Sequence, residues 1–315
     1  MAEPRRIDVH HHILPPVYKE RAREQLLAGT SLDPTPLFQW TPEGALAAMD
    51  RFGIETAIGS ISTPGIWFGD DRAARPLARD CNEFMAEMKR DNPKRFGFFA
   101  AIPLPDRDGS LAEIEHAFDR LGADGIGILT SYRDRWPGDP AFDAVFAELN
   151  RRKAVVFVHP TVPLCCVGLI PNIHPALTEF VFDTTRAITS FLANGTFARY
   201  PEIRFIFCHA GGTIMPISYR VASLERSPAL KAGLPHGVLA ELRKLYYDTA
   251  ASYTPPAIAA LRAVVPLSQL LFGTDNPYVP VAVSATGFDQ FGFSPEEAAA
   301  INRENALRLF PNLRD

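Results

Sequence analysis

Several residues that can bind a metal ion or transfer a proton follow short apolar runs of the chain. These residues are His10, His12, His159, His209 and Asp275. His10 and His12 are two residues apart, so on an extended backbone both imidazoles point to one side while His11 points away. A pair of imidazoles, a third imidazole and one carboxylate form a nitrogen-rich donor set. Such a set predicts a site for one divalent metal ion, with zinc preferred and manganese, iron or cobalt also possible.

The segments that position these residues alternate between short apolar runs and amphipathic stretches of helical period, which indicates repeated βα units. Several runs are apolar on both faces, as is typical of strands inside a closed barrel. The expected strands are Arg6–His10, Glu55–Ser62, Phe96–Pro103, Gly125–Thr130, Ala154–Pro160, Arg204–Ala210, Leu245–Ala251 and Gln269–Asp275. We therefore expect an α/β fold, a (β/α)₈ TIM barrel, in a single domain over residues 1–315.

Helix starts are marked where a capping side chain precedes a proline. This occurs at Thr41-Pro42, Asp139-Pro140 and Ser294-Pro295. Helices are expected over Gln39–Phe52 and Asp71–Asp91, after the first two strands.

The carboxyl ends of the eight strands of such a barrel meet at one mouth, where active sites are built. Taken singly, a histidine such as His159 or His209 is more often a hydrogen-bonded residue of the core, and the HHH run resembles a fragment of a tag. Their joint position at strand ends of one polarity favours a functional site instead.

Composition excludes several classes of protein. The chain has 315 residues, is 47% hydrophobic and carries a net charge of −4, so it lacks the basic excess of a nucleic-acid partner. The N-terminal segment has no apolar core of a signal peptide, and no apolar run is long enough to span a membrane. The four cysteines show no disulfide pattern, so we expect a cytoplasmic protein. They are Cys81, Cys165, Cys166 and Cys208.

The segments IDVHHHILP, VVFVHP, FIFCHAGG, LFGTDNPY and ENALRLF resemble, in this order, the motifs of the amidohydrolase-2 group. That group includes 2-amino-3-carboxymuconate semialdehyde decarboxylase and the o-hydroxybenzoate decarboxylases. The resemblance implies that His10, His12, His159 and Asp275 bind the metal, and that His209 acts as an acid or base beside it. His-x-His in the first motif is closer to the muconate-semialdehyde enzyme than to the resorcylate type, which has Glu-x-His.

The segments STPGIWFGDD, TVPLCCVGLIP and ALTEFVFDTTRAI also resemble those of 6-methylsalicylate-type decarboxylases. Arg220 matches an arginine that in the family reaches the active site of the neighbouring subunit, which implies a homodimer or a higher homo-oligomer. The muconate-semialdehyde enzyme binds its dicarboxylate with two arginines, of which Arg220 matches the second, and the segment PTPLFQW has no counterpart of the first, so a substrate with one carboxylate is expected.

The resemblance thus implies a metal-dependent, non-oxidative decarboxylase, a carboxy-lyase, acting on a small aromatic carboxylic acid. The ring carbon must be protonated during the reaction, and sequence alone leaves His209 and Asp275 as alternative donors. By their positions, Trp67 and Phe68 are candidates for substrate binding. Further candidates for the walls of the pocket are Tyr247, Asp248, Asn276 and His174. The open alternatives are a lactonase or amidohydrolase using the same metal and an activated water, a hydratase, and an inactive binding barrel.

Overall fold

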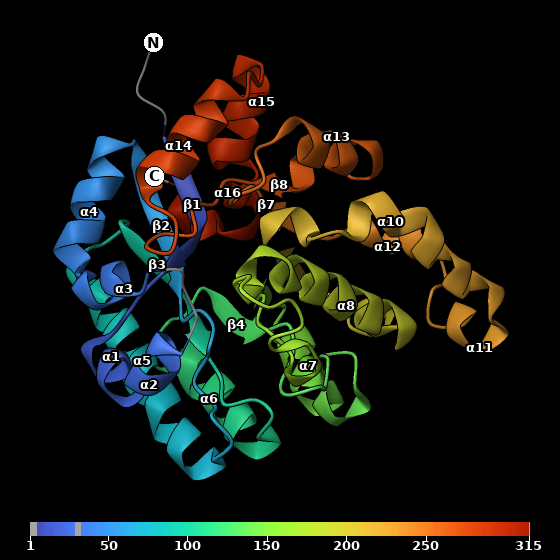
Figure 1. Cartoon of the computed structure of the whole chain (residues 1–315), viewed down its shortest axis with the longest axis horizontal. Helices are drawn as coiled ribbons and strands as arrows, with labels where there is room; N and C mark the ends of the chain where they lie inside the picture. Colours follow the sequence, from blue (N-terminus) through green and yellow to red (C-terminus); the bar gives the residue numbers. More distant parts are fainter. Residues whose placement is uncertain (1–4, 29–32, 315) are drawn as a thin grey trace.

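A ring of eight parallel strands forms the centre of the computed structural model, which describes residues 5–28 and 33–314 (Figure 1). The strands pair in chain order, from β1 through β8. Their bounds are β1 Arg6–His12, β2 Ile54–Ser60, β3 Phe96–Ala101, β4 Gly125–Leu129, β5 Val155–His159, β6 Arg204–Phe207, β7 Tyr246–Asp248 and β8 Leu270–Leu271.

The ring closes between its first strand and the segment that follows its last. The backbone N–H of Val9 donates to the carbonyl of Phe272, and that of Asp275 donates to the carbonyl of His10. A further parallel bridge joins His11 to Asn276. The expected (β/α)₈ barrel is therefore confirmed, and closure places the first and last motifs of the sequence side by side.

Helices surround the strands (Figure 1). They are α1 Pro16–Arg21, α2 Arg23–Leu27, α3 Thr35–Gln39, α4 Pro42–Arg51, α5 Asp71–Asp91, α6 Arg107–Asp119, α7 Asp143–Arg151, α8 Glu179–Ala193, α9 Thr196–Arg199, α10 Ile214–Val221, α11 Pro228–Lys231, α12 Val238–Leu242, α13 Pro255–Val264, α14 Val281–Gln290, α15 Pro295–Ala299 and α16 Ala306–Leu309. Across residues 5–28 and 33–314, none of them combines the length and the apolar character needed to cross a bilayer.

The marked helix starts have the expected caps. The side chain of Thr41 accepts a hydrogen bond from the N–H of Gly44 at the start of α4, and Ser294 forms a capping box with Glu297 at the start of α15. Asp139 caps a short 3-10 helix rather than a long one. The helix expected from Gln39 begins only at Pro42, because Trp40 and Thr41 adopt extended conformations between α3 and α4.

The interior of the barrel is filled with side chains. Phe99 and Phe157 stack with their ring centroids 5.0 Å apart, and Phe310 packs against Phe99. The C-terminal residues Ala306, Leu307 and Phe310 belong to the same buried cluster as the strand residues, and each buried large side chain contributes roughly 1.5–3 kcal/mol. This packing leaves the mouth of the barrel as the place for a site.

Several strands are shorter than expected at their carboxyl ends. Strand β6 stops at Phe207 and β8 at Leu271, so His209 and Asp275 follow their strands rather than lying on them. His209, Ala210 and Asp275 have positive φ angles of 52°, 58° and 66°. A left-handed residue cannot continue a β ladder, so the chain turns where the polar side chains begin.

Candidate metal centre

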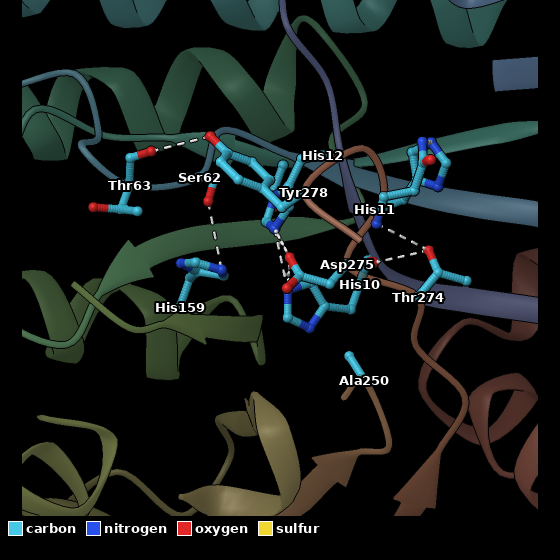
Figure 2. A network of polar contacts seen from close by, with 12 residues as sticks. His10, His11, His12, Ser62, Thr63, His159, Ala250, Thr274, Asp275 and Tyr278 are labelled. Carbon is cyan, nitrogen blue, oxygen red and sulfur yellow. Dashed lines mark hydrogen bonds and ion pairs between the residues drawn. The ribbon is translucent and has the colours of Figure 1, made fainter. Parts of the chain in front are cut away.

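Four buried side chains meet at the mouth of the barrel (Figure 2). His10, His12, His159 and Asp275 offer ligand atoms that all lie within 4.8 Å of one another. The Nε2 atoms of His10 and His12 are 3.1 Å apart, and His12 Nε2 is 2.9 Å from Asp275 Oδ1. The structure thus brings together residues that are separated by up to 265 positions in the sequence.

A second set of contacts turns each Nε2 toward the centre of this cluster. Nδ1 of His10 is 2.9 Å from Asp248 Oδ2, Nδ1 of His12 is 3.1 Å from Ser60 Oγ, and Nδ1 of His159 is 2.8 Å from the carbonyl of Pro160. A carboxylate or carbonyl can only accept, so Nδ1 of His10 and of His159 carries a proton and donates. Such contacts fix the tautomer of metal-binding histidines and orient their rings.

The donor set fits a divalent cation. Burial lowers the pKa of His12 to about 4. Burial, together with His12 and His10, holds the pKa of His159 well below its usual value. Both shifts favour the neutral imidazole, which is the form that binds metals. Burial alone would raise the pKa of Asp275, but His10 and the other neighbouring histidines hold it well below its usual value. Ring nitrogens this close to one another and to a carboxylate form a donor set that suits a cation.

The surroundings of His10 also favour a positive charge. Burial opposes a charged ring there, but Cys208, Asp248 and Asp275 together hold the pKa of His10 well above its usual value. A proton on His10 or a metal ion can supply the charge that the two carboxylates attract. Because metal-binding imidazoles are neutral, a metal ion bound here would replace that proton.

His209 lies beside the cluster. Its backbone N–H donates to Asp248 Oδ1 over 3.0 Å, and its Nδ1 is 3.0 Å from the carbonyl of Ala250. That carbonyl can only accept, so Nδ1–H donates and Nε2 is left free, 3.9 Å from Asp275 Oδ2. His209 lines the cavity in front of the cluster, where Nε2 can take up or release a proton.

A cavity of about 300 Å³ opens onto the cluster, at the small end of the roughly 300–1,000 Å³ found for ligand pockets. Its wall includes His159, His209 and Asp275 together with apolar and aromatic side chains from the loop before α8, from α8 itself and from the segment after β8. These are Leu177, Phe180, Val181, Tyr278 and Val279. Such a lining suits a single ring.

Two of the predicted substrate residues lie elsewhere. Trp67 and Phe68 line a neighbouring cavity that shares no lining residue with the one at the metal cluster, and the guanidinium of Arg133 lies over the Trp67 ring at 4.9 Å. The loop after β2 therefore places both side chains at a cavity other than the one that contains Asp275.

Three of the residues predicted as pocket walls, Tyr247, Asp248 and Asn276, do not line the cavity at the metal cluster. Tyr247 is fully buried, and its hydroxyl donates to the carbonyl of Leu242. Asp248 supports His10 and His209, and Asn276 Nδ2 contacts Nε2 of His11. Arg220 is exposed on α10, and in the described parts of the chain its guanidinium pairs with no acid.

Sequence reasoning missed several supporting residues. Tyr278 packs edge-on against His12 with ring centroids 5.2 Å apart and donates its hydroxyl proton to the carbonyl of Thr63. Ser62 Oγ lies 3.4 Å from Nε2 of His159 (Figure 2). Tyr278 is the last residue of the segment LFGTDNPY, three residues after Asp275, and its place in this segment was the signal that could have identified it.

Comparison with known proteins agrees with this geometry. The sequence pattern of a family described as Amidohydrolase matches residues 7–311, and the chain belongs to that family. The chain is 34% identical to the 6-methylsalicylic acid decarboxylase of Penicillium expansum over 319 aligned residues. The aligned region covers 98% of this chain and 97% of the relative.

Two further relatives extend the comparison. The decarboxylase yanB of Aspergillus niger is 34% identical over 331 residues, covering 98% of this chain and 88% of the relative. A crystal structure of an amidohydrolase II superimposes with a TM-score of 0.89 at 28% identity and covers 97% of this chain and 99% of the other.

Proposed function

We propose that this chain is a metal-dependent, non-oxidative decarboxylase of an o-hydroxybenzoate such as 6-methylsalicylate. The observation that carries the proposal is the buried cluster of His10, His12, His159 and Asp275, which opens with His209 onto a small aromatic cavity. The relatives that match nearly the whole chain are decarboxylases, one of them of 6-methylsalicylic acid.

The cluster would hold one divalent ion through Nε2 of the three histidines and a carboxylate oxygen of Asp275. Three imidazoles and a carboxylate favour zinc, and manganese is the alternative. A bound ion would hold the oxygens of the acid and stabilise the negative charge that shifts onto them.

The difficult step is protonation of the ring carbon that bears the carboxylate, because it interrupts the aromatic system. The bond to the carboxylate carbon then breaks, its electron pair restores the aromatic ring, and carbon dioxide leaves. One proton enters the product in each turnover, and no oxidant or organic cofactor is required.

His209 is placed to supply this proton. Its Nδ1 is held by the carbonyl of Ala250, so a protonated ring presents its second N–H at Nε2, toward the cavity. Asp275 is the weaker candidate for the proton donor, because its Oδ1 already contacts His12. Burial would raise the pKa of Asp275, but the surrounding histidines hold it well below the usual value, so the side chain is a carboxylate without a proton to give. We therefore assign the acid/base role to His209.

Hydrolysis of a lactone or amide is the second candidate, because an activated water at the same cluster could attack a carbonyl carbon. The near full-length similarity to decarboxylases does not favour it.

A homodimer is part of the proposal. Seven of the large exposed apolar side chains lie between residues 164 and 182, and two more lie on α10, which packs beside α8. They are Leu164, Val167, Leu169, Ile170, Ile173, Leu177, Phe182, Ile217 and Tyr219. An apolar surface of this kind is typical of a subunit interface, and Arg220 stands next to it.

Two broader expectations remain part of the proposal. We place the chain in the cytoplasm, because all four cysteines are free thiols. The Sγ atoms of Cys165 and Cys166 lie 2.7 Å apart without forming a disulfide bond. We also take residues 1–315 as one domain, since the strands pair in chain order and the C-terminal segment packs against β1 and β8.

A substrate panel tests the reaction. We expect carbon dioxide release from 6-methylsalicylate without oxygen, and product formed in deuterated water should carry deuterium at the carbon that lost its carboxylate. His209→Ala should lower turnover by roughly a hundredfold or more while keeping its metal. Carbon dioxide is measured beside hydrolysis of a lactone panel. Efficient lactone hydrolysis with no decarboxylation across many hydroxybenzoates would contradict the proposal.

A further inference from the structure

The long connection between β5 and α8 brings one more histidine to the cavity. His174 stands directly before the 3-10 turn Pro175–Leu177, and it lines the same cavity as His159, His209 and Asp275. It belongs to no metal-binding group, and the mechanism above does not use it.

Hydrogen bonding fixes the position of the proton on this ring. Nδ1 of His174 accepts a hydrogen bond from the backbone N–H of Ala176, with 3.2 Å between the two nitrogens. A nitrogen that accepts carries no proton, so Nε2 of the neutral ring carries it and is a donor. This Nε2 is buried and has no hydrogen-bond partner among the described residues.

An unpaired buried donor is unfavourable, and none of the described residues of the cavity wall pairs with this one. The wall residues that follow His174 most closely in the chain, Ala176, Leu177 and Phe180, have apolar side chains. The described lining also contains no lysine or arginine of this chain, so a bound aromatic acid has to obtain hydrogen bonds from other groups. A negatively charged oxygen is the strongest acceptor for such a donor.

We propose that the Nε2–H of His174 donates a hydrogen bond to a carboxylate or phenolic oxygen of the bound aromatic acid, and so orients its ring in front of the metal cluster. The proposal rests on the proposed function for the class of substrate. It makes His174 a binding and positioning residue, whereas His209 moves the proton.

Two substitutions separate this role from the structural one. In His174→Asn, the side-chain oxygen can still accept from the N–H of Ala176, as asparagine does at helix caps, but the donor at the Nε2 position is lost. In His174→Gln, the amide nitrogen reaches close to the Nε2 position while the cap is lost. The exposed His236→Asn serves as a matched control.

Each variant is loaded with zinc, and binding of salicylate is measured by calorimetry beside KM and kcat for decarboxylation. We expect His174→Asn to raise Kd and KM about tenfold or more, which is the effect of losing a hydrogen bond to a charged acceptor. His174→Gln should stay within about threefold of the wild type, and His236→Asn should be unchanged.

The outcomes are distinct. Wild-type affinity and KM in His174→Asn would overturn the proposal. Equal losses of affinity in His174→Asn and His174→Gln would also overturn it, because they would assign the effect to the imidazole ring and not to its donor. A wild type that binds salicylate but releases no carbon dioxide from any hydroxybenzoate would refute the proposed function alone, while the binding arm would still decide the role of His174. A wild type that binds no aromatic acid would refute both.

Discussion

His209 and Asp275 share a backbone feature that bears on their chemistry. Both have positive φ angles, 52° and 66°, which side-chain-bearing residues seldom adopt. Asp275 is held there by the hydrogen bond from its N–H to the carbonyl of His10, and His209 by the one from its N–H to Asp248. Strained conformations of this kind persist where surrounding contacts enforce them, and they are concentrated at functional sites.

At the residue scale, the metal ligands can be tested one at a time. We expect the purified protein to hold about one divalent ion per chain, and His12→Ala and Asp275→Ala to lose most of it, because each removes one of four converging ligands. Elemental analysis measures the ion and identifies zinc or manganese. Chelation should abolish decarboxylation.

His11→Gln is the matched control for these variants. His11 is adjacent to the ligands but points away from them, with its Nδ1 3.0 Å from Asp8 and its Nε2 in contact with Asn276. We expect this variant to keep its metal. Full metal content and normal turnover in His12→Ala would contradict the assigned ligand set.

At the element scale, a buried carboxylate joins the end of β4 to α8. Asp183 on α8 is completely buried and accepts hydrogen bonds from Thr130 Oγ1, Ser131 Oγ and Trp136 Nε1 at 2.5, 2.9 and 2.7 Å. The same helix carries Phe180 and Val181 into the cavity wall. The contact therefore sets both the stability of this part of the barrel and the position of one face of the cavity.

Removing this carboxylate should be costly. We expect Asp183→Leu to lower the free energy of unfolding by about 3 kcal/mol or more, because three buried donors lose their acceptor, and Asp183→Asn to have a smaller effect. Urea unfolding measures both changes. The exposed Asp108→Asn should stay within about 0.5 kcal/mol of the wild type, and an Asp183→Leu protein as stable as this control would show that the contact has no stabilising role.

The bounds of the strands and helices show which parts of the fold could be predicted from the sequence. The apolar runs identified all eight strands, and the caps identified the starts of α4 and α15, because periodicity and capping are local properties. The carboxyl ends of β6 and β8 were placed too late, since the left-handed turns at His209 and Asp275 depend on hydrogen bonds to distant residues. The positions of Trp67 and Phe68 depend on the path of a loop, which no periodic pattern encodes.

At the scale of the whole molecule, the exposed apolar side chains between residues 164 and 182 lie on the connection before α8 and on the first turn of α8, and both segments also contribute to the wall of the cavity. In Figure 1, α10, α12 and α11 extend away from the strands next to α8. Burying this surface against a second copy would place the loop between two subunits and would link assembly to the shape of the cavity.

Arg220 gives this arrangement a direct test. Its side chain is exposed, it does not line the cavity of its own chain, and its guanidinium can bind a carboxylate with two hydrogen bonds. We expect Arg220→Ala and His209→Ala to be nearly inactive alone but to regain activity when the two chains are unfolded and refolded together. In a twofold dimer, about half of the molecules are then mixed and each holds one intact site, so about a quarter of the wild-type activity should return. Arg226→Ala, a change at another exposed arginine nearby, should keep normal activity when assayed in parallel. If the mixture stays inactive although a tag on one of the two variants retains the other and so shows mixed dimers, then Arg220 does not serve the partner's site, and the single carboxylate of the substrate must be bound by groups of one chain.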